Sequence, residues 1–183
     1  MMHWKRNLPN YLTYLRIAVI PALVLVFFLQ GEWSYYLSTF LFFIAGVSDW
    51  LDGYLARTWQ VQSNLGRFLD PIADKLLVAT ALLLLVKADR ADLLPAIAIV
   101  CREILVSGLR EFLAEIRVSV PVSKLAKFKT AAQMLAIGCL LLGAGGPEWL
   151  HSESLGRFLL WLAALLTLVT GYAYLRTGLK HMD

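Results

Sequence analysis

Six long apolar runs are the feature that most limits what this chain can fold into. They cover residues 12–29, 35–55, 68–86, 93–113, 125–142 and 155–175. Each run approaches the ~20 helical residues that cross a hydrocarbon core of about 30 Å. A helix pairs its own backbone polar groups, as a segment in lipid must. The sequence therefore predicts an all-α integral membrane protein with six transmembrane helices in one bundle.

The composition agrees with this class. The chain has 183 residues, of which 59% are hydrophobic and 16% charged, whereas about a quarter of a typical soluble domain is charged. The connections between runs are short, so we expect a single membrane domain over residues 1–183. The basic residues flank apolar runs and form no soluble basic face, which disfavours nucleic acid as a partner.

The distribution of lysine and arginine predicts the orientation. One side of the predicted bundle collects Lys5, Arg6, Arg57, Arg67, Arg117, Lys124, Lys127, Lys129, Arg176 and Lys180. Positive residues favour the cytoplasmic side, so both termini are expected there. The first residues, MMHWKRNLPN, are either a short interfacial helix or an ordinary positive flank with an aromatic belt.

Four aspartates interrupt the apolar pattern where the second run ends and the third begins. Asp49 and Asp52 are three residues apart and share one helix face, and Asp70 and Asp74, four apart, share another. Antiparallel packing of these two spans would bring all four carboxylates to one depth. Clustered carboxylates need a counter-charge, and hard oxygen ligands suit Mg²⁺ or Mn²⁺. The spacing therefore predicts a divalent-cation site.

Small residues accompany the aspartates. Gly53 and Ala56 lie on the face of the first pair, and Gly66 lies on the face of the second. They leave room for a ligand or for another backbone, and Arg57 is placed to meet an anion at headgroup level. Two other interpretations stay open: the acids pair with nearby basic residues to stabilise a bundle, or they form a proton or cation pathway.

The complete pattern, DxxDGxxAR followed after eight residues by GxxxDxxxD, is identified as the signature of the CDP-alcohol phosphotransferase family. The prediction of six transmembrane helices also fits that family. Further segments resemble the members that use glycerol-3-phosphate as acceptor: NLPNYLTYLR, GRFLDPIADKLLV, REILVSGLREFLAE and VSKLAKFKTAAQM. The resemblance thus covers most of the chain.

The resemblance implies an activity, namely transfer of the phosphatidyl group from CDP-diacylglycerol to glycerol-3-phosphate with release of CMP. It implies that two divalent ions, Mg²⁺ or Mn²⁺, are held on the diphosphate by Asp49, Asp52, Asp70 and Asp74. Asp74 would also be the catalytic base on the acceptor hydroxyl, which attacks the phosphorus directly. The resemblance further implies a homodimer among membrane phospholipids. A bacterial inner membrane is the expected location, with the active site facing the cytoplasm.

The liponucleotide is expected beside the small residues, because they admit a flat group. By resemblance, the start of the first run borders the same pocket, and its alternative role is helix initiation and headgroup contact. The residues assigned to CDP-diacylglycerol are Asn10, Thr13, Arg16, Asp52, Gly53, Ala56, Arg57 and Gly66.

A phosphorylated acceptor needs cations of its own. The candidates are Arg102, Arg110 and Lys127. Arg102 lies about ten residues into its run, a depth at which arginine is costly unless it faces a wet cavity, and guanidinium groups bind phosphate bidentately. Glu103 and Glu111 could instead neutralise the two arginines in a structural role. Lys124 and Lys129 are interpreted first as positive flanking residues.

Two kinds of alternative function remain at this point. The chemistry could be the same with serine, inositol phosphate or another acceptor, although a cationic pocket favours a phosphorylated one. The other alternative is a divalent-cation carrier or a structural membrane protein.

Overall fold

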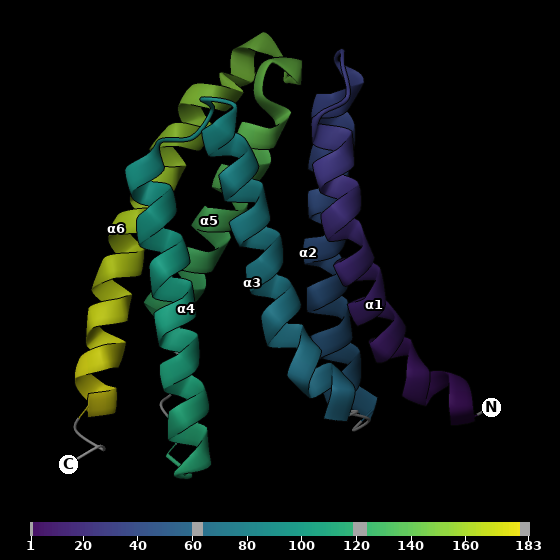
Figure 1. Cartoon of the computed structure of the whole chain (residues 1–183), viewed down its shortest axis with the longest axis vertical. Helices are drawn as coiled ribbons and strands as arrows, with labels where there is room; N and C mark the ends of the chain where they lie inside the picture. The colour runs from purple at the N-terminus through teal and green to yellow at the C-terminus, as the bar shows by residue number, and fades with distance from the viewer. Residues whose placement is uncertain (1, 60–63, 119–123, 180–183) are drawn as a thin grey trace.

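The computed structural model describes residues 2–59, 64–118 and 124–179, without the side chains of 2–10, 50, 52–57, 64–65, 67 and 124. The chain forms a bundle of long helices (Figure 1). These are α1 Met2–Phe27, α2 Trp33–Trp59, α3 Asn64–Lys87, α4 Leu93–Glu115, α5 Lys124–Leu142 and α6 Ser152–Leu179. Two short 3₁₀ helices, η1 Gly143–Gly145 and η2 Glu148–Leu150, precede α6. The described residues contain no strand, so the all-α prediction is confirmed.

Each helix matches one predicted apolar run, and most extend beyond it. In the described part of the chain, two helical segments are long and apolar enough to cross a membrane, Leu125–Gly145 and Glu148–Leu179. The apolar part of α1, Tyr11–Phe27, is shorter, and charged residues interrupt α3 and α4. Many large apolar side chains lie on the outside, with Leu83 69% exposed and Leu94 70% exposed. An apolar exterior is typical of a membrane protein, and the crossing by all six helices stays a prediction.

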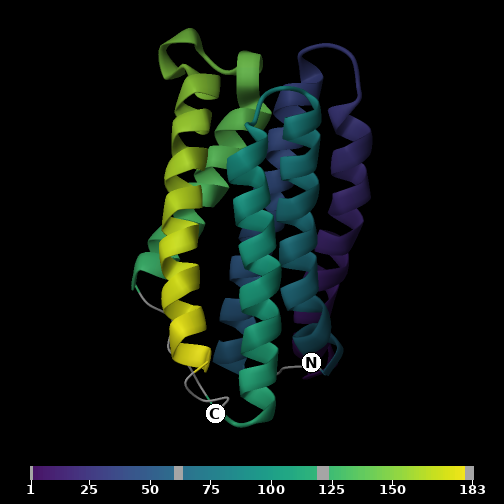
Figure 2. The same cartoon turned by 60° about the vertical axis from the view of Figure 1, so that its left-hand side comes forward.

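Successive helices run in opposite directions, so α1 begins and α6 ends at the same end of the bundle (Figures 1 and 2). We call this the terminal end. The connections α1–α2, α3–α4 and α5–α6 lie at the other end. The start of α1 and the end of α6 therefore lie at one end of the bundle, while the membrane side that this end faces stays a prediction. Helix α1 runs without interruption from Met2, and the interfacial location of its first residues also stays a prediction.

Helix α1 packs against both α2 and α3, and α6 packs against α4 and α5. The sequence predicted direct packing of the second span on the third, but among the described residues α2 and α3 make only slight contact. Buried α1 side chains such as Leu23 share one core with Phe42 of α2 and Leu77 of α3. Helix α1 therefore links α2 and α3 by packing against both, where the sequence predicted that α2 and α3 pack directly on each other.

Glycines allow α6 to approach its neighbours closely. A Cβ atom built on Gly156 would lie 2.7 Å from Leu140 of α5, and one built on Gly178 would lie 2.8 Å from Leu109 of α4. A Cβ on Gly171 would lie 2.9 Å from Cγ of Arg102. Small residues at such contacts are a common way to pack membrane helices. Here they allow α4 and α5 to pack closely on α6, and Gly171 leaves room for the side chain of Arg102.

Candidate active site

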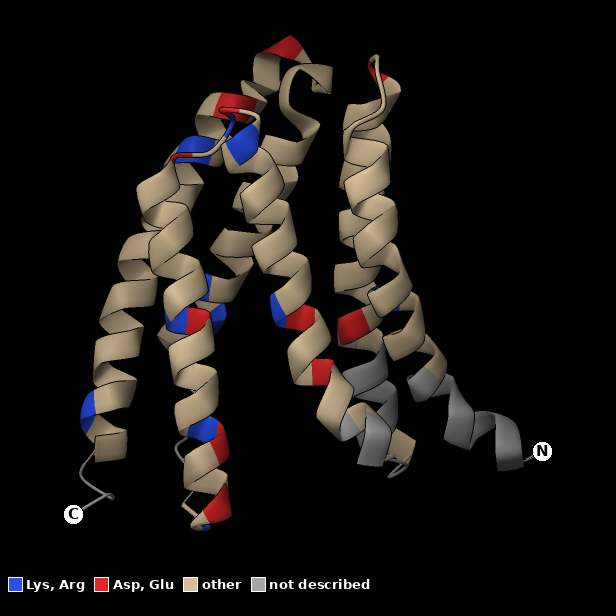
Figure 3. Ribbon diagram, in the orientation of Figure 1, with Lys and Arg blue, Asp and Glu red and all other residues tan. Residues whose placement is uncertain are grey.

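Charged residues occupy two levels of the bundle (Figure 3). One set lies at the connections remote from the terminal end, where Arg157 pairs with Asp92 at 3.7 Å. The other set lies in the half nearer the terminal end, on several helices. The aspartates and the predicted acceptor residues belong to this second set, and its contacts define the candidate site.

Two polar side chains of α1 hold two of the aspartates. The guanidinium of Arg16, which is fully buried, places Nη1 2.8 Å from Oδ1 of Asp49. Thr13 donates a hydrogen bond of 2.6 Å from Oγ1 to Oδ1 of Asp70. Thr13 and Arg16 are one turn apart and so share a helix face. That face of α1 therefore joins α2 and α3 at the level of the carboxylates.

The aspartates that the structure describes lie in one neighbourhood. The carboxylate of Asp49 on α2 is close enough to the carboxylates of Asp70 and Asp74 on α3 for their charges to interact. Gly66 lies one turn before Asp70 in α3, as expected. The other predicted residues of the signature and of α1 have side chains outside the described set. They are Asn10, Asp52, Gly53, Ala56 and Arg57.

The donor atoms in this neighbourhood suit a hard divalent cation, because they are carboxylate oxygens with one paired guanidinium. Among the described side chains, no set of three or more acidic, histidine or cysteine groups is already arranged around one point. Asp52, the second aspartate of the signature, lies outside that set. The chemistry of the carboxylates thus fits a metal ion.

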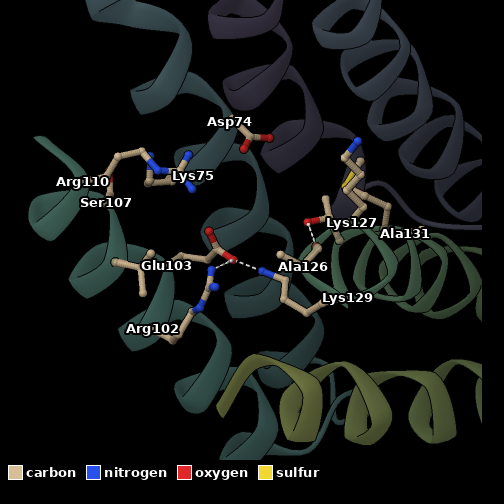
Figure 4. A pocket seen from close by; sticks show the side chains of 13 residues that line it. Asp74, Lys75, Arg102, Glu103, Ser107, Arg110, Ala126, Lys127, Lys129 and Ala131 are labelled. Carbon is tan, nitrogen blue, oxygen red and sulfur yellow. Dashed lines mark hydrogen bonds and ion pairs between the residues drawn. The ribbon is translucent and has the colours of Figure 1, made fainter. Parts of the chain in front are cut away.

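Helices α3, α4 and α5 enclose a cavity of about 470 Å³ (Figure 4). This volume lies in the range of small-molecule sites. The lining residues are Asp74, Lys75, Arg102, Glu103, Val106, Ser107, Arg110, Ala126, Lys127, Lys129, Thr130, Ala131 and Met134. The three predicted acceptor residues are all among them. The structure therefore brings Arg102, Arg110 and Lys127 together from two helices.

The cavity is rich in positive charge. Its lining contains two acidic residues, Asp74 and Glu103, and five basic residues. The basic residues are Lys75, Arg102, Arg110, Lys127 and Lys129. Phosphate oxygens are well matched by such a set, since arginine binds them bidentately and lysine adds point charges. The excess of cations makes the cavity suitable for a small phosphorylated molecule.

Arg102 is held in place from two sides. Its Nη2 donates a hydrogen bond of 3.3 Å to Oγ1 of Thr170 in α6, and its Nη1 lies 3.5 Å from Oε1 of Glu103. The side chain is 14% exposed, and it crosses the α6 backbone at Gly171. These contacts hold the guanidinium of Arg102 inside the bundle, where it lines a polar cavity. This is the kind of position that the sequence predicts for an arginine so far from the end of its apolar run.

Lys129 is not an exposed flanking residue, which is the first interpretation that the sequence favours. The residue is 2% exposed, and its Nζ donates a hydrogen bond to Oε1 of Glu103. The available signal was helical periodicity. Ala132, Ala136 and Ile137 form the buried stripe of α5, and extending that stripe back by one turn reaches Lys129. The lysine belongs to the cavity wall because it continues the inward face of its helix.

Arg110 lies nearer the terminal end of α4 and is exposed. Its guanidinium carbon lies 5.7 Å from the ring centroid of Tyr174, a cation–π arrangement. In the described part of the chain, no ion pair joins Arg110 to Glu111. The suggested neutralisation of the arginines by neighbouring glutamates is therefore seen for Arg102 with Glu103, but not for Arg110 with Glu111.

Asp74 connects the two groups of residues. It lines the cationic cavity, and its carboxylate is in electrostatic range of both Asp49 and Glu103. Figure 4 shows Asp74 at one side of the cavity, with Glu103, Arg102 and Lys129 across from it. A molecule in the cavity would thus have its anionic end near the cations and another part near Asp74.

Known proteins provide an independent comparison. The sequence profile described as CDP-alcohol phosphatidyltransferase matches residues 6–169. A Rickettsia felis protein is 46% identical over 98% of this chain and 99% of its own length. A Rickettsia prowazekii protein is 47% identical over 96% and 97%, and a Haemophilus influenzae protein is 44% identical over 95% and 94%. All three are named CDP-diacylglycerol–glycerol-3-phosphate 3-phosphatidyltransferase. This chain belongs to the CDP-alcohol phosphatidyltransferase family.

Proposed function

We propose that this protein transfers the phosphatidyl group of CDP-diacylglycerol to glycerol-3-phosphate, giving phosphatidylglycerophosphate and CMP. Its relatives with that name align with nearly the whole chain. The single observation that carries the proposal is the position of Asp74, which lines a cavity rich in cations and also lies near Asp49. A phosphorylated acceptor and a metal-bound liponucleotide can meet at that carboxylate.

The liponucleotide would lie on the aspartate side. Asp49, Asp52, Asp70 and Asp74 would hold divalent ions, Mg²⁺ or Mn²⁺. Such ions, when bound, offset the charge of the diphosphate and of the departing CMP. The small residues Gly53, Ala56 and Gly66, with Asn10 and Arg57, would accept the cytidine end of the substrate. The contacts of Thr13 with Asp70 and of Arg16 with Asp49 support a role for both in positioning these carboxylates.

The acceptor would bind in the cationic cavity. Its phosphate would contact Arg102, Arg110 and Lys127, together with Lys129. Because the lining has five basic residues against two acidic ones, a phosphate monoester is favoured over serine. The carbon chain of the acceptor then extends from these cations toward Asp74.

The chemical step is a direct displacement at phosphorus. A hydroxyl oxygen of the acceptor forms a new bond to the phosphorus that carries the diacylglycerol. The bond from that phosphorus to the oxygen of CMP breaks, and CMP leaves with the electron pair. Asp74 accepts the hydroxyl proton, a role for which a carboxylate within hydrogen-bond reach is suited. No covalent enzyme intermediate is required.

We further propose that all six helices cross a bacterial inner membrane. Both termini and the active site would face the cytoplasm, because lysine and arginine gather at the terminal end. The apolar exterior of the bundle supports this placement, and a homodimer is the expected assembly.

The function can be tested with purified protein and CDP-diacylglycerol in mixed micelles. Glycerol-3-phosphate, serine and inositol phosphate are supplied separately with Mg²⁺ or Mn²⁺, and CMP and the lipid product are measured. We expect turnover only with glycerol-3-phosphate, its loss with a chelator, and its recovery when the ion is restored. Equal turnover with serine or inositol phosphate would contradict the acceptor, and absence of CMP with every acceptor would contradict the reaction. Metal uptake by liposomes without CMP release would favour a cation carrier instead.

A further inference from the structure

Glu103 is an unexpected residue in the wall of a phosphate-binding cavity. A carboxylate beside the cations repels an incoming phosphate, so a purely phosphate-binding wall would not need it. Both of its ionic contacts use the same oxygen, since Lys129 Nζ and Arg102 Nη1 both approach Oε1. These contacts hold two cations of the wall, one from α4 and one from α5. The other carboxylate oxygen, Oε2, takes no part in either contact.

The second oxygen, Oε2, faces the interior of the cavity. Figure 4 shows it directed away from Lys129 and Arg102 and toward the side of Asp74. Within the described residues, no hydrogen bond reaches Oε2. The carboxylates of Asp74 and Glu103 are also in electrostatic range of each other. Two carboxylates from different helices therefore border the same open space.

The order of groups across the cavity matches the order of groups in the proposed acceptor. Asp74 lies at one side, Glu103 follows, and Arg102 and Lys129 lie beyond it (Figure 4). Glycerol-3-phosphate carries a reactive primary hydroxyl, then a secondary hydroxyl, and then the phosphate. With the phosphate on Arg102 and Lys129 and the primary hydroxyl at Asp74, the secondary hydroxyl falls beside Glu103.

We propose that Glu103 is a specificity-determining residue that accepts a hydrogen bond from the secondary hydroxyl of the acceptor. Oε1 contacts Lys129 and Arg102 in the cavity wall, and Oε2 accepts the hydrogen bond that the secondary hydroxyl donates. The site thereby selects a phosphate monoester with a hydroxyl next to the attacking one. This inference rests on the proposed function. It adds a contact for the secondary hydroxyl, which lies between the phosphate and the reactive hydroxyl of the acceptor.

The test compares glycerol-3-phosphate with 3-hydroxypropyl phosphate, which keeps the phosphate and the primary hydroxyl but lacks the secondary one. The measured quantity is the ratio of kcat/KM for the two acceptors, followed by CMP release. A hydrogen bond to a charged group contributes enough to predict a ratio of about tenfold to a hundredfold in the unmodified protein. Losing Glu103 should bring this ratio to within about threefold of one.

Three variants separate this contact from the structural role of Glu103. Glu103→Met removes the carboxylate. Because it also leaves Lys129 buried without its partner, the double variant Glu103→Met/Lys129→Met removes the whole pair, which proteins tolerate better than an unpaired buried charge. Lys129→Met removes the ion pair between Lys129 and Glu103 but keeps the carboxylate and its contact with Arg102. A control, Glu115→Met, changes an exposed glutamate of the same helix outside the cavity lining.

We expect the acceptor ratio to collapse in both variants that lack Glu103, and to stay near the unmodified value in Lys129→Met and Glu115→Met. Lys129→Met should lower kcat/KM for both acceptors together, since both carry the phosphate. A ratio that is unchanged without Glu103, or that falls as far in Lys129→Met, would overturn the inference. Turnover of both acceptors at equal rates by the unmodified protein would overturn it while leaving the proposed function intact. Absence of any CMP release with glycerol-3-phosphate would instead reject the proposed function.

Discussion

Thr13 of α1 donates a hydrogen bond of 2.6 Å to Asp70 of α3, a residue 57 positions further along the chain. Thr13 is 2% exposed, so this contact is shielded from solvent. One turn further along α1, the buried guanidinium of Arg16 holds Asp49 of α2. Helix α1 thus orients carboxylates on two other helices, and a substitution in α1 can alter the candidate active site without touching an aspartate.

Thr13→Val keeps the shape of the side chain but removes the hydroxyl. Asp70 then loses a hydrogen bond to a charged group, and we expect kcat/KM for CMP release to fall by about tenfold or more. The concentration of Mg²⁺ needed for half-maximal rate should rise, because the carboxylate is less well positioned. Thr13→Ser should restore most of the activity, which a loss of packing alone would not explain.

The matched control for this prediction is Thr39→Val. Thr39 lies in α2 and donates its hydroxyl to a backbone carbonyl of its own helix, that of Tyr35. The chemical change is the same but is remote from the aspartates, so the dependence on Mg²⁺ should not move. If the two valine variants showed equal losses, a positioning role for Thr13 would be excluded.

Gly171→Ala tests how the wall of the cavity is supported. The added Cβ would lie 2.9 Å from Cγ of Arg102, near the root of that side chain, so the arginine must shift. We expect the KM for glycerol-3-phosphate to rise by about threefold to tenfold while the KM for CDP-diacylglycerol stays nearly unchanged. Initial rates measured against each substrate in turn provide the test.

Gly108→Ala is the control for this change, because nothing lies within 4 Å of a Cβ built there. Replacing a helical glycine by alanine in open space should leave both KM values unaffected and can stabilise the helix slightly. Equal effects of the two alanine substitutions on acceptor KM would show that Gly171 does not act through Arg102.

Arg110→Ala tests the exposed cation of the acceptor cavity. We expect it to raise the KM for glycerol-3-phosphate by about tenfold or more, since it removes a charged contact to phosphate. The KM for CDP-diacylglycerol should change by less than about twofold. Arg176→Ala, which removes an exposed arginine of α6 outside the cavity lining, should leave both values unchanged. The reverse pattern, with the larger effect on the liponucleotide, would assign Arg110 to the nucleotide side.

The sequence predicted much of this fold because its strongest signals are local. Apolar runs of membrane-spanning length located all six helices, and the spacing of Asp70 and Asp74 placed both on one face of α3. The termini of the helices were less predictable, since α2 and α6 continue past the apolar runs into polar residues. Helical hydrogen bonding does not stop where hydrophobicity does.

The partners of individual polar residues depend on helix packing, which the sequence does not display. Thr13 and Arg16 are expected to border the nucleotide pocket, which stays a prediction; their contacts with Asp70 and Asp49 could not be read from the sequence. The sequence favours a flanking position for Lys129, because a lysine near a membrane surface usually has one. Lys129 lies on the inward face of α5, and its side chain reaches Glu103 of α4, which provides its counter-charge.

The most direct test concerns Asp74, where the aspartate neighbourhood and the cationic cavity meet. Asp74→Asn keeps the size of the side chain but removes its charge and its ability to accept a proton readily. The measurement is CMP release from CDP-diacylglycerol with glycerol-3-phosphate and Mg²⁺, compared with the unmodified protein at equal amounts of folded protein. We predict a loss of at least about a hundredfold in kcat, as expected when a catalytic base is removed. A rate within about tenfold of the unmodified protein would contradict the assignment of Asp74 as the residue at which the two substrates react.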